Sequence, residues 1–181
     1  MKHILMAVSG PAGVGKGTIV KTIIDKREDV VESVSCTTRL PRKGEIDGRH
    51  YFFLTKEEFL RRIEEGDFLE YDEHFGNYYG TPRSFVEKTL ETKSIILEID
   101  VVGALQVKKV FPELVLVMIV PPSFEELRRR LEGRGSESEE TMKIRMDRIA
   151  YELAQKDKYD YVIVNDDLET AIKEVEQIFD N

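Results

Sequence analysis

The stretch that decides the fold is Gly10-Pro11-Ala12-Gly13-Val14-Gly15-Lys16-Gly17-Thr18. It lies between an apolar run typical of a buried strand, Ile4 to Val8, and an amphipathic pattern typical of a helix, Ile19 to Ile24. Glycines here let successive backbone N–H groups point at phosphate oxygens, and the helix that follows adds its positive N-terminal end. Lys16 supplies a mobile charge for the terminal phosphates. The stretch therefore predicts a phosphate-binding loop.

The hydroxyl of this loop is displaced by one position. The usual pattern has Ser or Thr directly after the lysine, whereas here Gly17 intervenes and Thr18 carries the hydroxyl. We therefore assign the metal-facing role to Thr18. An ordinary glycine-rich turn would explain the glycines, but it would not explain Lys16 at this offset.

Composition narrows the class of protein. A chain of 181 residues with 41% hydrophobic residues is sufficient for one α/β domain with a real core. The net charge of −8 argues against a general nucleic-acid or anionic-membrane surface, so we expect neither partner. A single cysteine, Cys36, excludes an intramolecular disulfide framework, and the longest apolar run, Leu114 to Val120, is far shorter than the roughly 20 residues of a membrane helix. We expect a cytoplasmic protein, either a monomer or a homodimer.

Short apolar runs alternate with helix-like segments along most of the chain. The runs are Ile4 to Val8, Ile95 to Ile99, Val115 to Val120 and Tyr161 to Val164. This alternation is typical of a parallel sheet covered by helices on both faces. Expected helix caps are Ser123 with Glu126, Thr55 with Glu58, Thr81 before Pro82, and Asp167.

Two stretches depart from this alternation. Residues 34–85 mix strand-like pieces with one short helix, Lys56 to Glu65, and predict an inserted subdomain with antiparallel strands. Residues 123–157 predict two helices joined by an elbow, Gly133-Arg134-Gly135-Ser136. A core with two appended pieces is typical of an enzyme that closes over its substrates.

Arginines form two candidate clusters. Arg39 and Arg42 share a loop, with Tyr51 nearby, and can converge on one phosphate; a solvated basic turn is the equal alternative. In the second cluster, Arg145 and Arg148 lie three residues apart on one helix face. With Arg134 from the elbow, they would meet the charge of a transferring phosphoryl group. We interpret Arg128 and Arg129 as solvated residues that pair with nearby glutamates.

Acidic and amide side chains mark three further positions. Glu70 lies within a short apolar strand, where it either points outward, the default reading, or has a polar partner. Glu98 and Asp100 end another strand and point to the same side, where this class of sheet places groups near metal or substrate. Asn165 and Asp166 follow the last strand and either contact a base or cap a helix.

Together these clusters resemble guanylate kinases, from Ile4 to about Phe179. The motifs that carry the resemblance are Ser35 to Arg42 with Gly44 and Tyr51, Gly76 to Gly80, Leu131 to Gly135, and Val164-Asn165-Asp166. The resemblance implies the α/β fold of P-loop nucleoside monophosphate kinases in one domain, 1–181. Its implied parts are a core (1–33, 86–122 and 158–181), a small mixed α/β GMP-binding subdomain (34–85) and a helical lid (123–157).

The resemblance implies direct in-line transfer of a phosphoryl group from ATP to GMP, and to dGMP, in purine nucleotide metabolism and GMP recycling. The implied catalytic residues are Lys16, Arg39, Arg134, Arg145 and Arg148. ATP would be bound by Gly10, Pro11, Ala12, Gly13, Val14, Gly15, Lys16, Gly17, Thr18, Arg134, Asn165 and Asp166. GMP would be bound by Ser35, Arg39, Arg42, Tyr51, Glu70, Tyr79, Thr81 and Asp100. Mg²⁺, the implied cofactor, would lie near Thr18, Glu98 and Asp100, through water.

Glu70 makes chemical sense in this context. Guanine presents two adjacent donors, N1–H and N2–H₂, to a carboxylate, whereas adenine would present a lone pair. The chain departs from the family pattern at Gly17-Thr18, where Ser-Thr or Ser-Ser is common, and at Glu98, where aspartate is common. Two alternatives stay open: a related P-loop kinase acting on another phosphorylated acceptor, and a binding module of this fold without catalysis.

Overall fold

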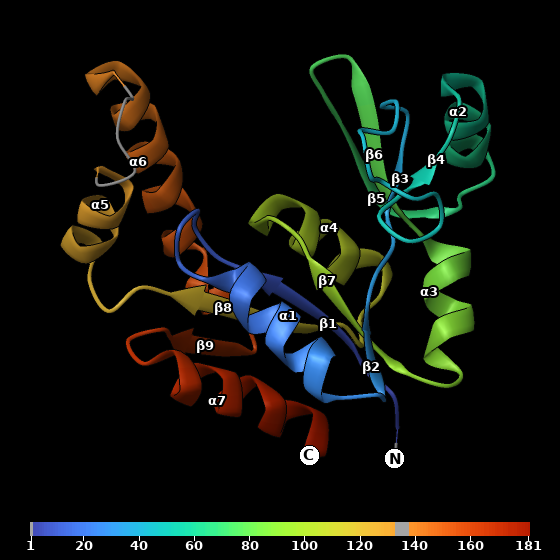
Figure 1. Cartoon of the computed structure of the whole chain (residues 1–181). Helices are drawn as coiled ribbons and strands as arrows, with labels where there is room; N and C mark the ends of the chain where they lie inside the picture. Colours follow the sequence, from blue (N-terminus) through green and yellow to red (C-terminus); the bar gives the residue numbers. More distant parts are fainter. Residues whose placement is uncertain (1, 133–137) are drawn as a thin grey trace.

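The computed structural model describes residues 2–132 and 138–181. Its centre is a five-stranded sheet (Figure 1). The strand order is β2-β7-β1-β8-β9, and every neighbouring pair is parallel. The strands are β1 (Leu5–Ser9), β2 (Val30–Glu32), β7 (Ser94–Glu98), β8 (Val115–Val120) and β9 (Tyr161–Val164). The predicted parallel sheet is therefore confirmed.

Helices cover both faces of this sheet. The helices of the core are α1 (Lys16–Lys26), α3 (Arg83–Leu90), α4 (Val101–Val110) and α7 (Leu168–Asp180). One face packs against α1 and α7 through residues such as Ile19 and Val175, and the other packs against α3 and α4 through Val86 and Val107. Because both faces are covered, every residue of β1 is buried, which explains its continuous apolar run.

A second sheet lies at one end of the core, beside α2 (Lys56–Glu64) (Figure 1). Its order is β4-β3-β6-β5, from the strands β3 (Cys36–Thr37), β4 (Phe52–Phe53), β5 (Phe68–His74) and β6 (Asn77–Pro82). Strand β6 pairs antiparallel with β3 and β5, as expected, whereas β3 and β4 are parallel. Phe59 of α2 stacks on Phe68 with ring centroids 4.4 Å apart and forms a separate small core.

Two helices stand at the opposite end, α5 (Phe124–Glu132) and α6 (Glu139–Ala154) (Figure 1). Leu127 and Leu131 of α5 pack with Ile149 of α6, whose apolar stripe matches the predicted one. The elbow predicted at 133–136 lies outside the described residues. A 3₁₀ turn, Lys156–Lys158, leads from α6 back to β9. Across residues 2–132 and 138–181, no helix has the length and apolar character needed to cross a bilayer.

Three of the four expected helix caps are confirmed and one is wrong. At the start of α5, Ser123 Oγ accepts the Glu126 N–H at 3.0 Å. Thr55 and Glu58 form the capping box of α2, and Asp167 accepts the Thr170 N–H at 2.8 Å at the start of α7. The Thr81 hydroxyl does not cap α3, because it donates instead to Glu70. Asp67 performs that role by accepting the Ser84 N–H at 2.9 Å. The cap therefore comes from a residue distant in sequence.

Candidate active site

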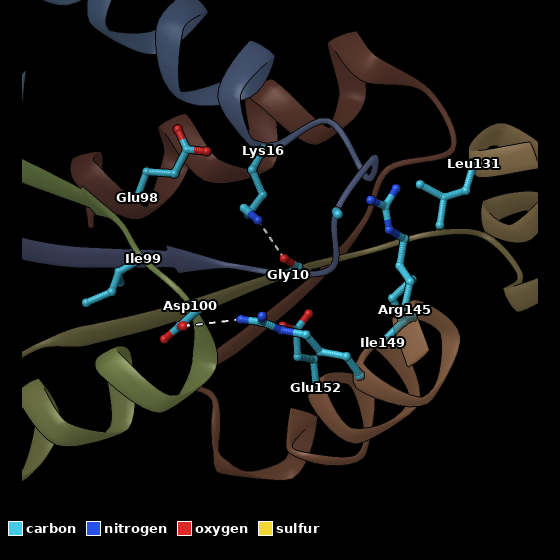
Figure 2. Close-up of a pocket in the computed structure, with 11 residues that line it drawn as sticks. Gly10, Lys16, Glu98, Ile99, Asp100, Leu131, Arg145, Ile149 and Glu152 are labelled. Atoms are coloured by element: carbon cyan, nitrogen blue, oxygen red, sulfur yellow. Dashed lines mark hydrogen bonds and ion pairs between the residues drawn. The ribbon is translucent and has the colours of Figure 1, made fainter. Parts of the chain in front are cut away.

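The glycine-rich loop connects β1 to α1 and forms one wall of a pocket of about 420 Å³ (Figure 2). Gly10, Gly13 and Gly15 all have positive φ angles, the conformation that favours glycine. Gly15 is the N-cap of α1, and the first turn of that helix contains no acidic residue. The positive helix end is thus left uncompensated, which favours binding of an anion.

Lys16 begins α1, and its side chain returns toward the loop (Figure 2). Its Nζ donates to the backbone carbonyl oxygen of Gly10 at 2.6 Å. Lys16 is therefore one of the residues that line the pocket. A phosphate in the loop would compete with the Gly10 carbonyl for this donor, and the ionic bond would be the stronger one.

The side chain of Asn165 holds the backbone of the glycine-rich loop by a hydrogen bond. Its Nδ2 donates to the Val14 carbonyl oxygen at 2.8 Å, and its backbone N–H donates to Val120 at 2.9 Å. Its side chain is so close to Gly15 that an added Cβ there would lie 2.6 Å from Nδ2. Asn165 thus contacts the loop backbone, while its neighbour Asp166 is exposed.

Helix α6 supplies the opposite wall of this pocket. Arg145, Arg148 and Glu152 line it, and Figure 2 shows Lys16 and Arg145 reaching into it from opposite sides. Arg148 contacts Glu152 through Nε at 3.2 Å and Asp100 through Nη2 at 3.4 Å. Two of the three predicted lid arginines therefore line the pocket opposite the loop. Arg134, the third, lies outside the described residues.

Arg128 and Arg129 point elsewhere. They form exposed ion pairs on α5, with Glu132 at 2.8 Å and Glu126 at 2.7 Å respectively. Their interpretation as solvated residues is confirmed.

A second, smaller cavity of about 170 Å³ adjoins the first, and Glu98 and Ile99 line both. Ser35, Tyr51, Glu70 and Thr81 line it, as do His50, Glu32 and Ser33, which the sequence analysis missed. The Ser33 hydroxyl is buried and has no hydrogen-bond partner among the described residues. A cavity with an unpartnered buried hydroxyl suits a polar ligand.

Glu70 faces this cavity with a partner, so it does not point outward into solvent. Thr81 Oγ1 donates to Glu70 Oε1 at 2.7 Å, across the β5–β6 pair. Burial raises the pKa of the Glu70 carboxyl, with a smaller contribution from the charge of Asp100, while the Thr81 hydrogen bond opposes this rise.

Asp100 lines the larger cavity, next to Ile99, which lines both. Its Oδ1 accepts the Gly103 N–H at 2.8 Å and so caps α4, while its Oδ2 faces Arg148. The Glu98 carboxylate lies close to Gly17 at the start of α1: a Cβ added at Gly17 would lie 3.7 Å from each of its two oxygens. Thr18 is exposed at the start of α1. No group of three or more acidic, histidine or cysteine side chains suited to a metal occurs among residues 2–132 and 138–181.

The remaining predicted acceptor residues cluster around Arg39. Its Cζ lies 5.4 Å from the ring centroid of Tyr51, and the Tyr51 and Tyr79 rings meet edge-on at 6.2 Å. Arg39 is paired with Glu45, a residue that the sequence analysis missed; Nη2 lies 2.9 Å from Oε1. The Arg42 side chain is exposed, but its backbone N–H donates to Glu45 at 2.7 Å. The signal for Glu45 was a carboxylate in the same loop as two arginines.

Comparisons with known proteins agree with this geometry. The family model described as guanylate kinase matches residues 2–181. The chain is 52% identical over 178 residues to the guanylate kinase of Clostridium perfringens strain SM101, covering 98% of this chain and 82% of that protein. It is 50% identical over 176 residues to the guanylate kinase of Caldanaerobacter subterraneus, covering 97% and 85%.

A solved structure is similar over the same extent. The crystal structure of guanylate kinase from Anaplasma phagocytophilum superimposes with a TM-score of 0.72 at 36% identity, covering 98% of this chain and 85% of that one. The loop, the two adjoining cavities and these similarities point to the same conclusion: the chain belongs to the guanylate kinase family.

Proposed function

We propose that this guanylate kinase binds ATP in the larger cavity, binds GMP in the smaller one, and transfers the phosphoryl group where the two adjoin. The observation that carries this assignment is the wall of Glu98 and Ile99 that both cavities share. Two substrates held on either side of that wall would bring the donor and acceptor phosphates together. Such positioning contributes much of the rate enhancement in phosphoryl transfer.

The donor phosphates would be held by the loop N–H groups and by Lys16. The β- and γ-phosphates compete for the Lys16 ammonium, which then leaves the Gly10 carbonyl. Arg145 and Arg148, from the facing helix, would neutralise the charge that spreads over the transferring group. Arg134 is proposed for the same role on its position in the sequence motif alone.

Asn165 would act on ATP through the loop. Its hydrogen bond to Val14 supports the backbone that binds phosphate, and Asp166 beside it is exposed for contact with the base. Both belong to the proposed ATP-binding set.

The acceptor would be recognised at both of its ends. Glu70 would accept the two guanine donors N1–H and N2–H₂, supported by Thr81, Ser35 and Asp100, whereas adenine would place a lone pair against the carboxylate. Arg39, Arg42, Tyr51 and Tyr79 would bind the phosphate. We propose that dGMP is accepted as well, because these contacts involve the base and the phosphate.

A divalent metal is implied by the family, and we propose Mg²⁺. The side chains near the loop offer oxygen donors, Glu98, Asp100 and Thr18, which suit a hard cation. They would hold Mg²⁺ through water while the ATP phosphates supply direct ligands. Bound there, the ion would neutralise phosphate charge.

We further propose that residues 34–85 and 123–157 act as a GMP-binding part and a lid on a core of 1–33, 86–122 and 158–181. The second sheet and the α5–α6 pair support these limits (Figure 1). Closure would exclude water, which would otherwise hydrolyse ATP. We place the enzyme in the cytoplasm, where its substrates are found and where Cys36 would stay reduced.

The test is ADP production from MgATP with GMP, dGMP, AMP, CMP, UMP or ribose bisphosphate supplied separately at matched concentrations. Turnover confined to GMP and dGMP is the expected result. Preference for another acceptor would overturn the role of Glu70 and keep the kinase assignment. Turnover with none of them would favour a binding module without catalysis.

A further inference from the structure

The loop between β3 and β4 contains an ion pair that the proposed function leaves unexplained. The Glu45 carboxylate contacts Arg39 through both oxygens, Oε2 to Nη1 at 3.0 Å and Oε1 to Nη2 at 2.9 Å. Both side chains are largely buried, with 15% of Arg39 and 20% of Glu45 exposed. A bidentate pair withdrawn from solvent fixes its geometry far better than an exposed one.

The same carboxylate also holds the loop backbone. Glu45 Oε2 accepts the Arg42 N–H at 2.7 Å, and the Glu45 N–H donates to the Arg42 carbonyl oxygen at 3.0 Å. These two hydrogen bonds close a turn whose Gly44 has a positive φ of 89°. Glu45 thus connects the two arginines that are proposed to bind the acceptor phosphate.

Glu45 and Leu40 occupy only part of the Arg39 guanidinium, and the Tyr79 side chain, itself proposed to bind the acceptor phosphate, is a further hydrogen-bond partner of Arg39. An arginine has five N–H donors in a rigid plane. Nη1 uses both of its hydrogens, on the Leu40 carbonyl oxygen and on Glu45, and Nη2 uses its inner hydrogen on Glu45. The donors that Glu45 and Leu40 do not use, Nε–H and the outer Nη2–H, lie on the same edge. Two parallel donors on one edge form the fork that binds a phosphate.

Aromatic rings fix the plane of this fork. The Arg39 Cζ lies 5.4 Å from the Tyr51 centroid and 6.0 Å from the Phe53 centroid. Rings that stack on a guanidinium restrict its tilt but not its rotation within its own plane. That rotation is the freedom that the Glu45 contacts remove.

We propose that Glu45 is a positioning residue for the acceptor phosphate: it locks Arg39 in plane and presents the Nε–Nη2 edge, and the Arg42 backbone turn, to the phosphate of GMP. The inference rests on the proposed function of Arg39 and Arg42. Glu45 itself does not touch the substrate. Because Arg39 and Arg42 hold its pKa at about 2, the carboxylate is ionised throughout the working pH range.

The test is the variant Glu45→Gln, which keeps the size of the side chain and removes its charge and one acceptor. The amide NH₂ would then face the Arg39 donors, so the guanidinium would rotate. We expect the Kd for GMP, measured by calorimetry, and the KM for GMP to rise about tenfold or more, while the KM for ATP stays within about twofold. Glu65→Gln is the matched control, because its pair with Arg61 is exposed and lies elsewhere in the same part.

Guanosine separates positioning from simple damage to the loop. It carries the base and the ribose but no phosphate, so its Kd, measured by NMR titration, should be the same in Glu45→Gln and the wild type. Equal weakening of guanosine and GMP would overturn the proposal, and so would unchanged or tighter GMP binding in Glu45→Gln. A thermal unfolding curve for each variant checks that the fold is intact.

A double variant gives a second, independent measure. Arg39→Lys removes the planar fork, so adding Glu45→Gln to it should cost less than about threefold further in GMP affinity. Fully additive losses would overturn the proposal. Failure of the proposed function and failure of the Glu45 proposal are distinguishable, because GMP binding is measured directly. A wild-type protein that binds GMP without turnover would contradict the proposed function, and its GMP affinity would still test the role of Glu45.

Discussion

The two halves of the candidate active site are built in different ways. The donor side is nine consecutive residues, 10–18, whose backbone is shaped by glycines and aimed by the start of one helix. The acceptor side is made of side chains from distant segments, such as Ser35, Tyr51, Glu70 and Glu98. A backbone site is a property of local sequence, whereas a side-chain site exists only once several elements have packed.

The largest effect should come from Lys16→Ala, on the donor side. Removing a charge aimed at the transferring phosphoryl group should lower kcat about 100-fold or more, while the KM for GMP changes little. Steady-state ADP release measures this. Lys21→Ala is the matched control, because Lys21 lies on the same helix in an exposed pair with Asp25. A near-normal kcat for Lys16→Ala would break the donor-side assignment.

A smaller effect, on selectivity, is expected from Glu70→Gln on the acceptor side. The amide would set an NH₂ against the guanine donors, so kcat/KM for GMP should fall about 10- to 100-fold while ATP binding is kept. Competition assays between GMP and AMP provide the measurement. Asp72→Asn, an exposed change on the same strand, is the control. Unchanged base selectivity would remove Glu70 from recognition.

The pH dependence of GMP binding sharpens the same point. Burial raises the pKa of Glu70 above its ordinary value, and guanine needs the ionised carboxylate. As the pH falls through the raised pKa, the carboxyl gains a proton and loses an acceptor. The KM for GMP should therefore rise, by about tenfold for each pH unit below that pKa. Profiles of KM between pH 5 and 8 measure it. Because the phosphate of GMP, with a second pKa of about 6, titrates in the same range, the wild type is compared with Glu70→Gln, whose profile should lack the part due to Glu70.

The smallest effect is expected for Arg128→Ala on α5. Its ion pair with Glu132 is exposed, with 61% and 51% of the two side chains accessible, so the free energy of unfolding should change by less than about 0.5 kcal/mol. Urea unfolding and ADP release check this, and turnover should stay within about twofold. If Arg128→Ala lost turnover while Arg145→Ala kept it, the roles assigned to these two arginines would be wrong.

Much of the fold was predictable because its signals are local. Continuous apolar strands, the glycine-rich loop and the capping box at Thr55 each depend on neighbours in sequence. The cap of α3 was not predictable, because it comes from Asp67, which lies between α2 and β5, while the Thr81 hydroxyl donates to Glu70. Local chemistry made Thr81 a good cap, but strand pairing gave its hydroxyl a different acceptor.

The candidate site divides in the same way. The residue types in the loop and the spacing of Arg39, Arg42 and Tyr51 pointed to phosphate, whereas Glu70, read alone, favoured a position in solvent. Only the pairing of β5 with β6 shows that Glu70 lies in a cavity. Glu32, Ser33 and His50 were missed because a side chain that lines a cavity carries no sequence signal of its own.

By itself, the sequence determined the phosphate-binding loop, the alternation of strands and helices, and the identity of the charged groups, because each follows from short-range conformational preference and hydrophobic period. Tertiary structure alone decided which charges meet. It formed the ion pairs of Glu45 with Arg39 and of Arg148 with Asp100, and the hydrogen bond from Asn165 to the Val14 carbonyl oxygen. The physical reason is that side-chain partners depend on distance in space, which only packing of the core fixes.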